Sequence, residues 1–208
     1  NLFLFLWALT VYGDFSAILA PEGVNNSIWN NKTIFYKGYH KLAYLHPNQF
    51  TPDKKVVEKY LSTDKPYFIL RFAKLNAYHD VNAKGIDSVI AQKLIKILHP
   101  QGDIYITSER ELEPEFEQFR LKIDPLDIHH VLFFSKLYIG DSQSMAVEAA
   151  MLGVPSVRFN NFAGKISVLE ELEHKYGLTF GIKTSQPKKL FEKVKELLLM
   201  ENLSEEFQ

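Results

Sequence analysis

Cysteine is absent from the 208 residues of this chain. Its absence removes thiolate nucleophiles, disulfide bonds and cysteine-ligated zinc from the available chemistry and leaves the redox compartment open. An excess of charge of one sign is also missing, since 24 lysine and arginine residues face 25 aspartate and glutamate residues, for a net charge of -1. Such a chain has no long-range positive field to concentrate nucleic acid. We therefore expect no nucleic acid as a partner.

Long apolar runs are also rare in this chain. The longest, NLFLFLWALTVY, stops at Gly13 and Asp14, well short of the roughly 20 apolar residues that a membrane-spanning helix needs. It has neither the basic start nor the small-residue cleavage site of a signal peptide. We therefore predict no transmembrane span, a helix buried inside a larger domain, and a cytoplasmic protein. Because the chain begins with this uncapped apolar segment, we expect the earlier part of that domain to be missing.

The sequence does contain a regular alternation of short apolar, β-rich runs with segments of helical period from residue 67 onward. Strands are predicted at 67–72, 103–107, 119–123, 137–140, 155–159 and 178–182, and helices near 85–98, 126–135, 144–152, 166–176 and 187–200. Repeated strand–helix units predict an α/β fold, a Rossmann-like parallel sheet with helices on both faces.

The pattern before residue 67 is different. Two further strands are predicted at 17–22 and 33–38, and the following YHKLAYLHPNQFTPD, with two prolines and few periodic apolar residues, is typical of a connector. We expect residues 1–46 to be a partial N-terminal α/β domain with the start of a connector. Residues 47–208 are then a nearly complete second, Rossmann-like domain.

The segment IGDSQSMAVEAAMLGVP joins a predicted buried strand to a predicted helix. Four small or polar residues lie at this junction: Asp141, Ser142, Gln143 and Ser144. Open parallel sheets bind ligands at the carboxyl ends of their strands, and the unpaired N–H groups of a helix N-terminus suit a phosphate. Glu148, one helical turn beyond Ser144, could accept hydrogen bonds from ribose hydroxyls. The same residue types also fit helix capping alone, so spacing leaves both interpretations open.

The same stretch, GDSQSMAVEAAMLGVP, resembles the Asp-Ser-Gly-Gly-x-x-x-Glu-Ala...Leu-Gly-x-Pro signature of the non-hydrolysing UDP-N-acetylglucosamine 2-epimerases. It is also similar to the donor-nucleotide site of GT-B glycosyltransferases. With GYHKLAYLHP, NAYHD, IDPLDIHH and LEELEHKYGL, the chain resembles a bacterial family close to these enzymes. The resemblance covers the second domain in element order, and its specific part is the stretch of GDSQSMAVEAAMLGVP.

This resemblance implies a nucleotide-binding site formed by Asp141, Ser142, Gln143, Ser144 and Glu148. Ser142, Gln143 and Ser144 are expected to face the diphosphate, and Glu148 the ribose. Gln143 and Ser144 depart from the family pattern, because they replace the two glycines that allow phosphate to approach the backbone closely.

A second loop is expected at the same edge of the sheet. The stretch RFAKLNAYHDVNAKGI follows strand 67–72 and carries Asn76, His79 and Asp80. It is loosely similar to the histidine-containing loop of the epimerases. Because imidazole titrates near neutral pH, His79 with Asp80 is the predicted catalytic acid or base, and Asn76 a predicted sugar or phosphate contact. A loop histidine beside a turn formed by Asp80 is the alternative.

Arg158, at the end of the strand PSVRF, and Asn160, which follows this strand, are the remaining predicted sugar or phosphate contacts. The bidentate fork of an arginine suits a phosphate, whereas an ion pair with a nearby acid is the alternative for Arg158. His129 and His130 are adjacent, so on a helix they point about 100° apart and do not form a metal-binding pair. We predict no metal and no cofactor.

The resemblance implies a nucleotide-sugar-binding enzyme of bacterial surface-polysaccharide synthesis, similar to UDP-N-acetylglucosamine 2-epimerase, with a UDP-sugar as ligand. A homodimer is compatible with this interpretation. The alternatives are a GT-B glycosyltransferase and a non-catalytic nucleotide-sugar-binding scaffold. Epimerisation needs carboxylates in the other domain for the C2 proton, whereas transfer needs an acceptor groove.

Overall fold

The computed structural model describes residues 18–22, 27–74, 85–200 and 207. Its body is a five-stranded, fully parallel sheet with the strand order β4-β3-β5-β6-β7. The strands are β3 (Tyr67–Phe72), β4 (Asp103–Ser108), β5 (Leu137–Gly140), β6 (Ser156–Phe159) and β7 (Thr179–Ile182). The predicted α/β fold with a Rossmann-like parallel sheet is confirmed.

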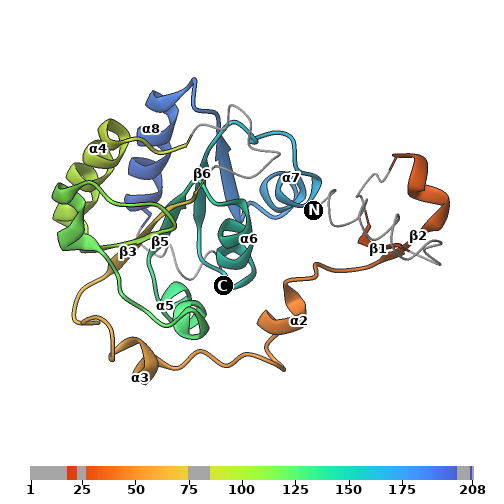
Figure 1. The fold of residues 1–208 in the computed structure, drawn as a ribbon, viewed down its shortest axis with the longest axis horizontal. Coiled ribbons are helices and arrows are strands. Elements are labelled where there is room, and N and C mark those ends of the chain that lie inside the picture. Colours follow the sequence, from red (N-terminus) through yellow and green to blue (C-terminus); the bar gives the residue numbers. More distant parts are fainter. Residues whose placement is uncertain (1–17, 23–26, 75–84, 201–206, 208) are drawn as a thin grey trace.

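Helices cover both faces of this sheet (Figure 1). One face packs against α4 (Ser88–Leu98) and α8 (Pro187–Leu198), and the other against α5 (Ile128–Phe133), α6 (Gln143–Met151) and α7 (Ser167–His174). Successive residues of a strand point to opposite faces, so Phe68 and Leu70 enter the first core and Tyr67 and Ile69 the second. Burial on both faces explains why the strands read as continuous apolar runs.

The strand order reverses between β3 and β5. The segment after β3 leads through α4 to β4 on one side, whereas the segment after β5 leads through α6 to β6 on the other. Because α4 and α6 lie on opposite faces of the sheet, the two connections diverge at the carboxyl ends of β3 and β5. This topological switch point is where open α/β sheets bind ligands.

The residues before the sheet form a separate small unit and a connector. Strands β1 (Ile18–Pro21) and β2 (Thr33–Tyr36) pair in parallel, flank the 3₁₀ helix η1 (Ser27–Lys32), and form no ladder with the larger sheet, as Figure 1 shows. The connector carries two one-turn helices, α2 (Leu42–Leu45) and α3 (Lys54–Val57). Leu45 and Val57 are buried in the core that contains α5 and α6.

One predicted strand is wrong. Residues 119–123 do not form a strand, because a 3₁₀ helix, η3 (Pro114–Phe119), runs into this segment, and only Arg120 forms a bridge, to Ile106. Leu121 and Ile123 pack against the core that contains α5 and α6 and Lys122 between them is exposed, so the segment has the alternating burial of a strand without its pairing. The predicted helix near 126–135 is a 3₁₀ turn, η4 (Pro125–Asp127), followed by α5. The 3₁₀ helix η2 (His99–Gln101) ends α4.

The apolar helix predicted within residues 1–12 lies outside the described residues. Of the helices in the described part of the chain, none combines the length and apolarity that crossing a bilayer requires.

Candidate nucleotide site at the switch point

Asp141 follows β5 directly and lies at the switch point. Its side chain is buried, and the carboxylate accepts hydrogen bonds from the backbone N–H groups of Ala73 (2.6 Å) and Ile86 (3.2 Å). Burial raises the pKa of Asp141 above its usual value although both N–H groups lower it. A Cβ at Gly85 would collide with the same carboxylate, which explains the glycine there. Asp141 therefore anchors the backbone rather than facing a ligand, which corrects its predicted nucleotide contact.

Asp141 bonds to Ala73 and Ile86, which are described residues on either side of the segment that carries Asn76, His79 and Asp80. These three predicted residues lie outside the described residues, so their roles stay predictions. The anchoring does place the two flanking residues at the switch point.

The N-terminus of α6 has the capping that its sequence predicts. The Ser142 hydroxyl accepts a hydrogen bond from the backbone N–H of Met145 (3.4 Å), and the Tyr138 hydroxyl donates to the Ser142 carbonyl (3.3 Å). Ser142 is therefore an N-cap in this structure. The amide nitrogen and oxygen of Gln143 are buried with no hydrogen-bond partner in the described part of the chain, whereas Ser144 is exposed. Two polar side chains with unused hydrogen-bonding capacity thus begin the helix.

Glu148 lies in a polar cluster built by three elements. Its Oε1 accepts hydrogen bonds from Lys41 Nζ (2.7 Å) and from the Tyr44 hydroxyl (2.8 Å), and its Oε2 lies 3.4 Å from His129 Nε2. Lys41 Nζ also donates to Ser144 Oγ at 2.6 Å. Lys41 caps α2, Tyr44 lies within it, and His129 comes from α5, so the connector is fastened to α6 by these side chains.

The electrostatics of this cluster keep it ionised. Burial alone would raise the pKa of Glu148, but its contacts with His129, Lys41 and Tyr44 outweigh burial and lower the pKa to about 2. Burial likewise lowers the pKa of Lys41, but the Glu148 carboxylate outweighs it and the pKa lies above its usual value. At neutral pH a carboxylate and an ammonium therefore face each other beside the first turn of α6.

Arg158 is not at the ligand edge, and its predicted sugar or phosphate contact is corrected. Its side chain points from β6 into the layer of α7 and is fully buried. Nη2 pairs with Glu173 Oε2 at 2.7 Å, and Nε donates to the Thr179 hydroxyl at 3.2 Å. The prediction failed because strand alternation turns the Arg158 side chain towards the helix layer, where Glu173 pairs with it.

Asn160 is committed to the backbone in the same way. Its amide nitrogen donates to the Asp141 carbonyl (3.2 Å), and its amide oxygen accepts from the N–H of Phe162 (2.9 Å). Because Asn160 is fully buried, its predicted sugar or phosphate contact is corrected too. It links the ends of β5 and β6 and so supports the loop before α6.

Sequence reasoning missed Lys41, Tyr44 and His129 as members of the site. Lys41 and Tyr44 are more than a hundred positions from Glu148, and no local spacing reveals that they meet it. The available signal was their i, i+3 spacing in HKLAY, which places both side chains on one face of a short helix. Among the described residues, no group of three or more His, Asp or Glu side chains could hold a metal ion.

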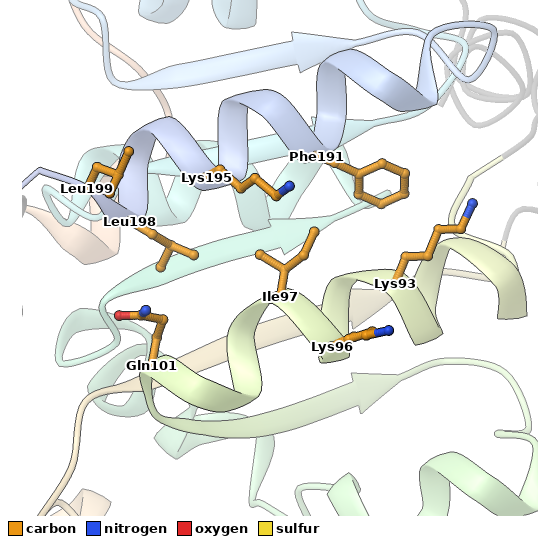
Figure 2. Close-up of a pocket in the computed structure, with 8 residues that line it drawn as sticks. All are labelled: Lys93, Lys96, Ile97, Gln101, Phe191, Lys195, Leu198 and Leu199. Carbon is orange, nitrogen blue, oxygen red and sulfur yellow. The ribbon is translucent and has the colours of Figure 1, made fainter.

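An apolar groove of about 630 Å³ lies on the opposite side of the sheet, between α4 and α8. Ile97, Phe191 and Leu198 line it, and the side chains of Lys93, Lys96 and Lys195 lie around it (Figure 2). Because the sheet separates this groove from α6, it is not part of the site at the switch point.

A scan against protein-family models found no match, and a search of curated proteins found none either. Solved structures do match. The UDP-GlcNAc 2-epimerase of Methanocaldococcus jannaschii, in complex with UDP-GlcNAc and UDP, is similar with a TM-score of 0.57 and 17% identity, over 89% of this chain and 55% of that one. The wall teichoic acid polymerase TagF is similar with a TM-score of 0.52 and 15% identity, over 93% of this chain and 50% of that one.

This chain has a GT-B-like fold. The described sheet and helices account for one Rossmann-like unit of such a fold, and the chain spans about half the length of these neighbouring structures. At these identities the likeness establishes the fold and not the reaction.

Proposed function

We propose that the switch point of this GT-B-like domain binds a nucleotide sugar, with the diphosphate at the N-terminus of α6. The observation that carries the proposal is the position of this N-terminus beside the reversal of strand order between β3 and β5. The exposed Ser144 hydroxyl offers a hydrogen-bonding group there, as does the Gln143 amide, which is buried and has no partner among the described residues. A helix N-terminus adds free N–H groups and a partial positive charge, both of which favour a phosphate.

The residue roles differ from those that the sequence resemblance implied. Ser144 and Gln143 remain as proposed diphosphate contacts, whereas Ser142 acts on the site as the cap of α6. Asp141 and Asn160 support the loop from behind. A ribose at Glu148 would have to displace hydrogen bonds from Lys41 and Tyr44, so our proposal does not depend on that contact.

For the reaction we propose 2-epimerisation of a UDP-sugar in bacterial surface-polysaccharide synthesis, with His79 and Asp80 as the candidate acid–base pair. The similarity to an epimerase in complex with UDP-GlcNAc and UDP supports this choice. Glycosyl transfer is the second candidate, because TagF matches over a comparable share of the chain. We also propose that the protein is cytoplasmic and forms a homodimer, but the proposed nucleotide site does not depend on either property.

Ser144→Asp tests the site directly. An added carboxylate should repel a diphosphate, whereas it favours the helix dipole and can pair with Lys41, so the protein should stay folded. We expect calorimetric titration to show binding of UDP or UDP-N-acetylglucosamine to the unaltered protein and at least a roughly tenfold loss in the variant, the size of one charge-dependent contact.

Ser167→Asp is the matched control, because Ser167 is an exposed serine in the first turn of α7. It should leave the titration unchanged. Absence of binding of UDP, CDP and GDP to the unaltered protein would disprove the nucleotide site. Deuterium incorporation at C2 of the bound sugar then distinguishes epimerisation from transfer, for which no exchange is expected.

A further inference from the structure

The connector supplies a cation to the proposed nucleotide site. Lys41 Nζ lies 2.6 Å from Ser144 Oγ and 2.7 Å from Glu148 Oε1, so its ammonium bridges two residues one helical turn apart on α6. The Lys41 side chain is 16% exposed, and the neighbouring Ser144 is exposed. The ammonium is therefore held by the protein yet adjacent to an open position at the start of the helix.

The arrangement around Lys41 fixes where this charge sits. Glu148 holds the ammonium on one side, and the Tyr44 ring lies 5.6 Å from it. Tyr44 also donates to Glu148, so the carboxylate cannot turn away without losing two hydrogen bonds. Because one N–H of the Lys41 ammonium is held by Glu148, its other N–H groups are directed towards Ser144.

This geometry matters because a diphosphate at Ser144 would otherwise face the Glu148 carboxylate. Two negative groups one helical turn apart repel each other, and a cation between them reverses the sign of that interaction. The first turn of α6 itself contains no basic residue. Lys41 is thus a cation beside this turn that can neutralise a phosphate.

We propose that Lys41 is the diphosphate-binding cation of this protein and that Glu148 positions it, in place of contacting the ribose. The inference rests on the proposed nucleotide function. The role of Lys41 also explains why Gln143 and Ser144 can stand where the related signature has two glycines. A side-chain ammonium reaches the phosphate from outside, so the backbone does not need the close approach that glycine permits.

Lys41→Met removes the charge and keeps most of the aliphatic length. We expect the affinity for UDP to fall roughly 10- to 100-fold, as for the loss of a charge-assisted phosphate contact. The affinity for uridine should be unchanged, and competition by inorganic pyrophosphate should be lost. Lys55→Met is the matched control, since Lys55 is an exposed lysine of the same connector whose side chain makes no hydrogen bond or ion pair with the described residues.

Lys41→Met leaves the Glu148 carboxylate without the Lys41 ammonium, which could destabilise the protein. A second pair of variants therefore lacks the Glu148 charge. Glu148→Gln and the double variant Lys41→Gln/Glu148→Gln both keep hydrogen-bonding side chains and differ in the Lys41 charge alone. We expect pyrophosphate to compete with UDP in the single variant and not in the double variant.

The outcomes separate the two proposals. UDP binding by the unaltered protein that persists at equal strength in Lys41→Met, or in the double variant, overturns the role of Lys41 and leaves the nucleotide site intact. No UDP binding by the unaltered protein overturns both. A ribose contact by Glu148 would instead weaken uridine and UDP alike in Glu148→Gln, without altering pyrophosphate competition.

Discussion

At the scale of single residues, the polar side chains at the ends of the strands divide into two kinds. Asp141 and Asn160 are buried and bond to backbone groups, so their work is to hold loops. Lys41 bonds to both Ser144 and Glu148 beside an exposed position, which is where we propose that a ligand binds. Residue type alone does not separate the kinds, because a carboxylate occurs in both.

The Glu148 carboxylate should make stability depend on pH. Its pKa is about 2 in the folded protein against 4.5 as the ordinary value, so the unfolded chain binds its proton first as the pH falls. The stabilisation is complete above pH 5 and is lost towards pH 2. Its upper limit is about 3 kcal/mol, because a pKa difference of one between the folded and unfolded states corresponds to roughly 1.4 kcal/mol.

Urea denaturation of the unaltered protein and of Glu148→Gln between pH 3 and pH 7 checks this dependence. The difference between the two curves is the quantity to measure, because the raised pKa of Asp141 contributes with the opposite sign. A difference that does not change over this pH range would contradict the ionised cluster.

At the scale of elements, buried polar pairs fix how helices lie on the sheet. Arg158 of β6 is fully buried against Glu173 of α7, and Glu173 also accepts the N–H of Gly181 in β7 (2.9 Å). This carboxylate therefore joins one helix to two strands. The short connector helix α2 is held similarly on α6 by Lys41 and Tyr44.

Removing one partner of the Arg158–Glu173 pair should be strongly destabilising. We expect Arg158→Met to lower the free energy of unfolding by about 3 kcal/mol, because it leaves a carboxylate in the helix layer without its cation. Arg158→Met/Glu173→Gln should recover part of this loss. Chemical denaturation of both single variants and the double variant measures the coupling, and strictly additive losses would show that the pair contributes nothing.

At the scale of the whole molecule, the connector packs against the unit of the five-stranded sheet more closely than its sequence indicates. The boundary predicted after residue 46 falls just past α2, yet Leu45 is 3% exposed within the core of α5 and α6. The β1–β2 pair, by contrast, forms no ladder with the five-stranded sheet. The contacts therefore favour a unit that includes α2, which is a proposal about the domain boundary.

Two fragments test this boundary. We expect residues 39–208 to unfold cooperatively, because they keep both cores and the Lys41–Glu148 contact. Residues 47–208 should be less stable by roughly 3 kcal/mol, since their truncation removes the buried Leu45 and takes Lys41 and Tyr44 away from Glu148. Thermal unfolding followed by circular dichroism compares them, and equal midpoints would place α2 outside the folded unit.

The sequence by itself determined the parallel α/β architecture, most strand positions and the location of the α6 N-terminus, because these follow from local periodicity and capping. It could not determine which side chains meet there. Asp141 finds Ala73 and Ile86, and Lys41 finds Glu148, only after the sheet has brought distant segments together. Tertiary structure decided which polar residues are buried supports and which remain beside an exposed position, since burial and pairing depend on neighbours that no local pattern specifies.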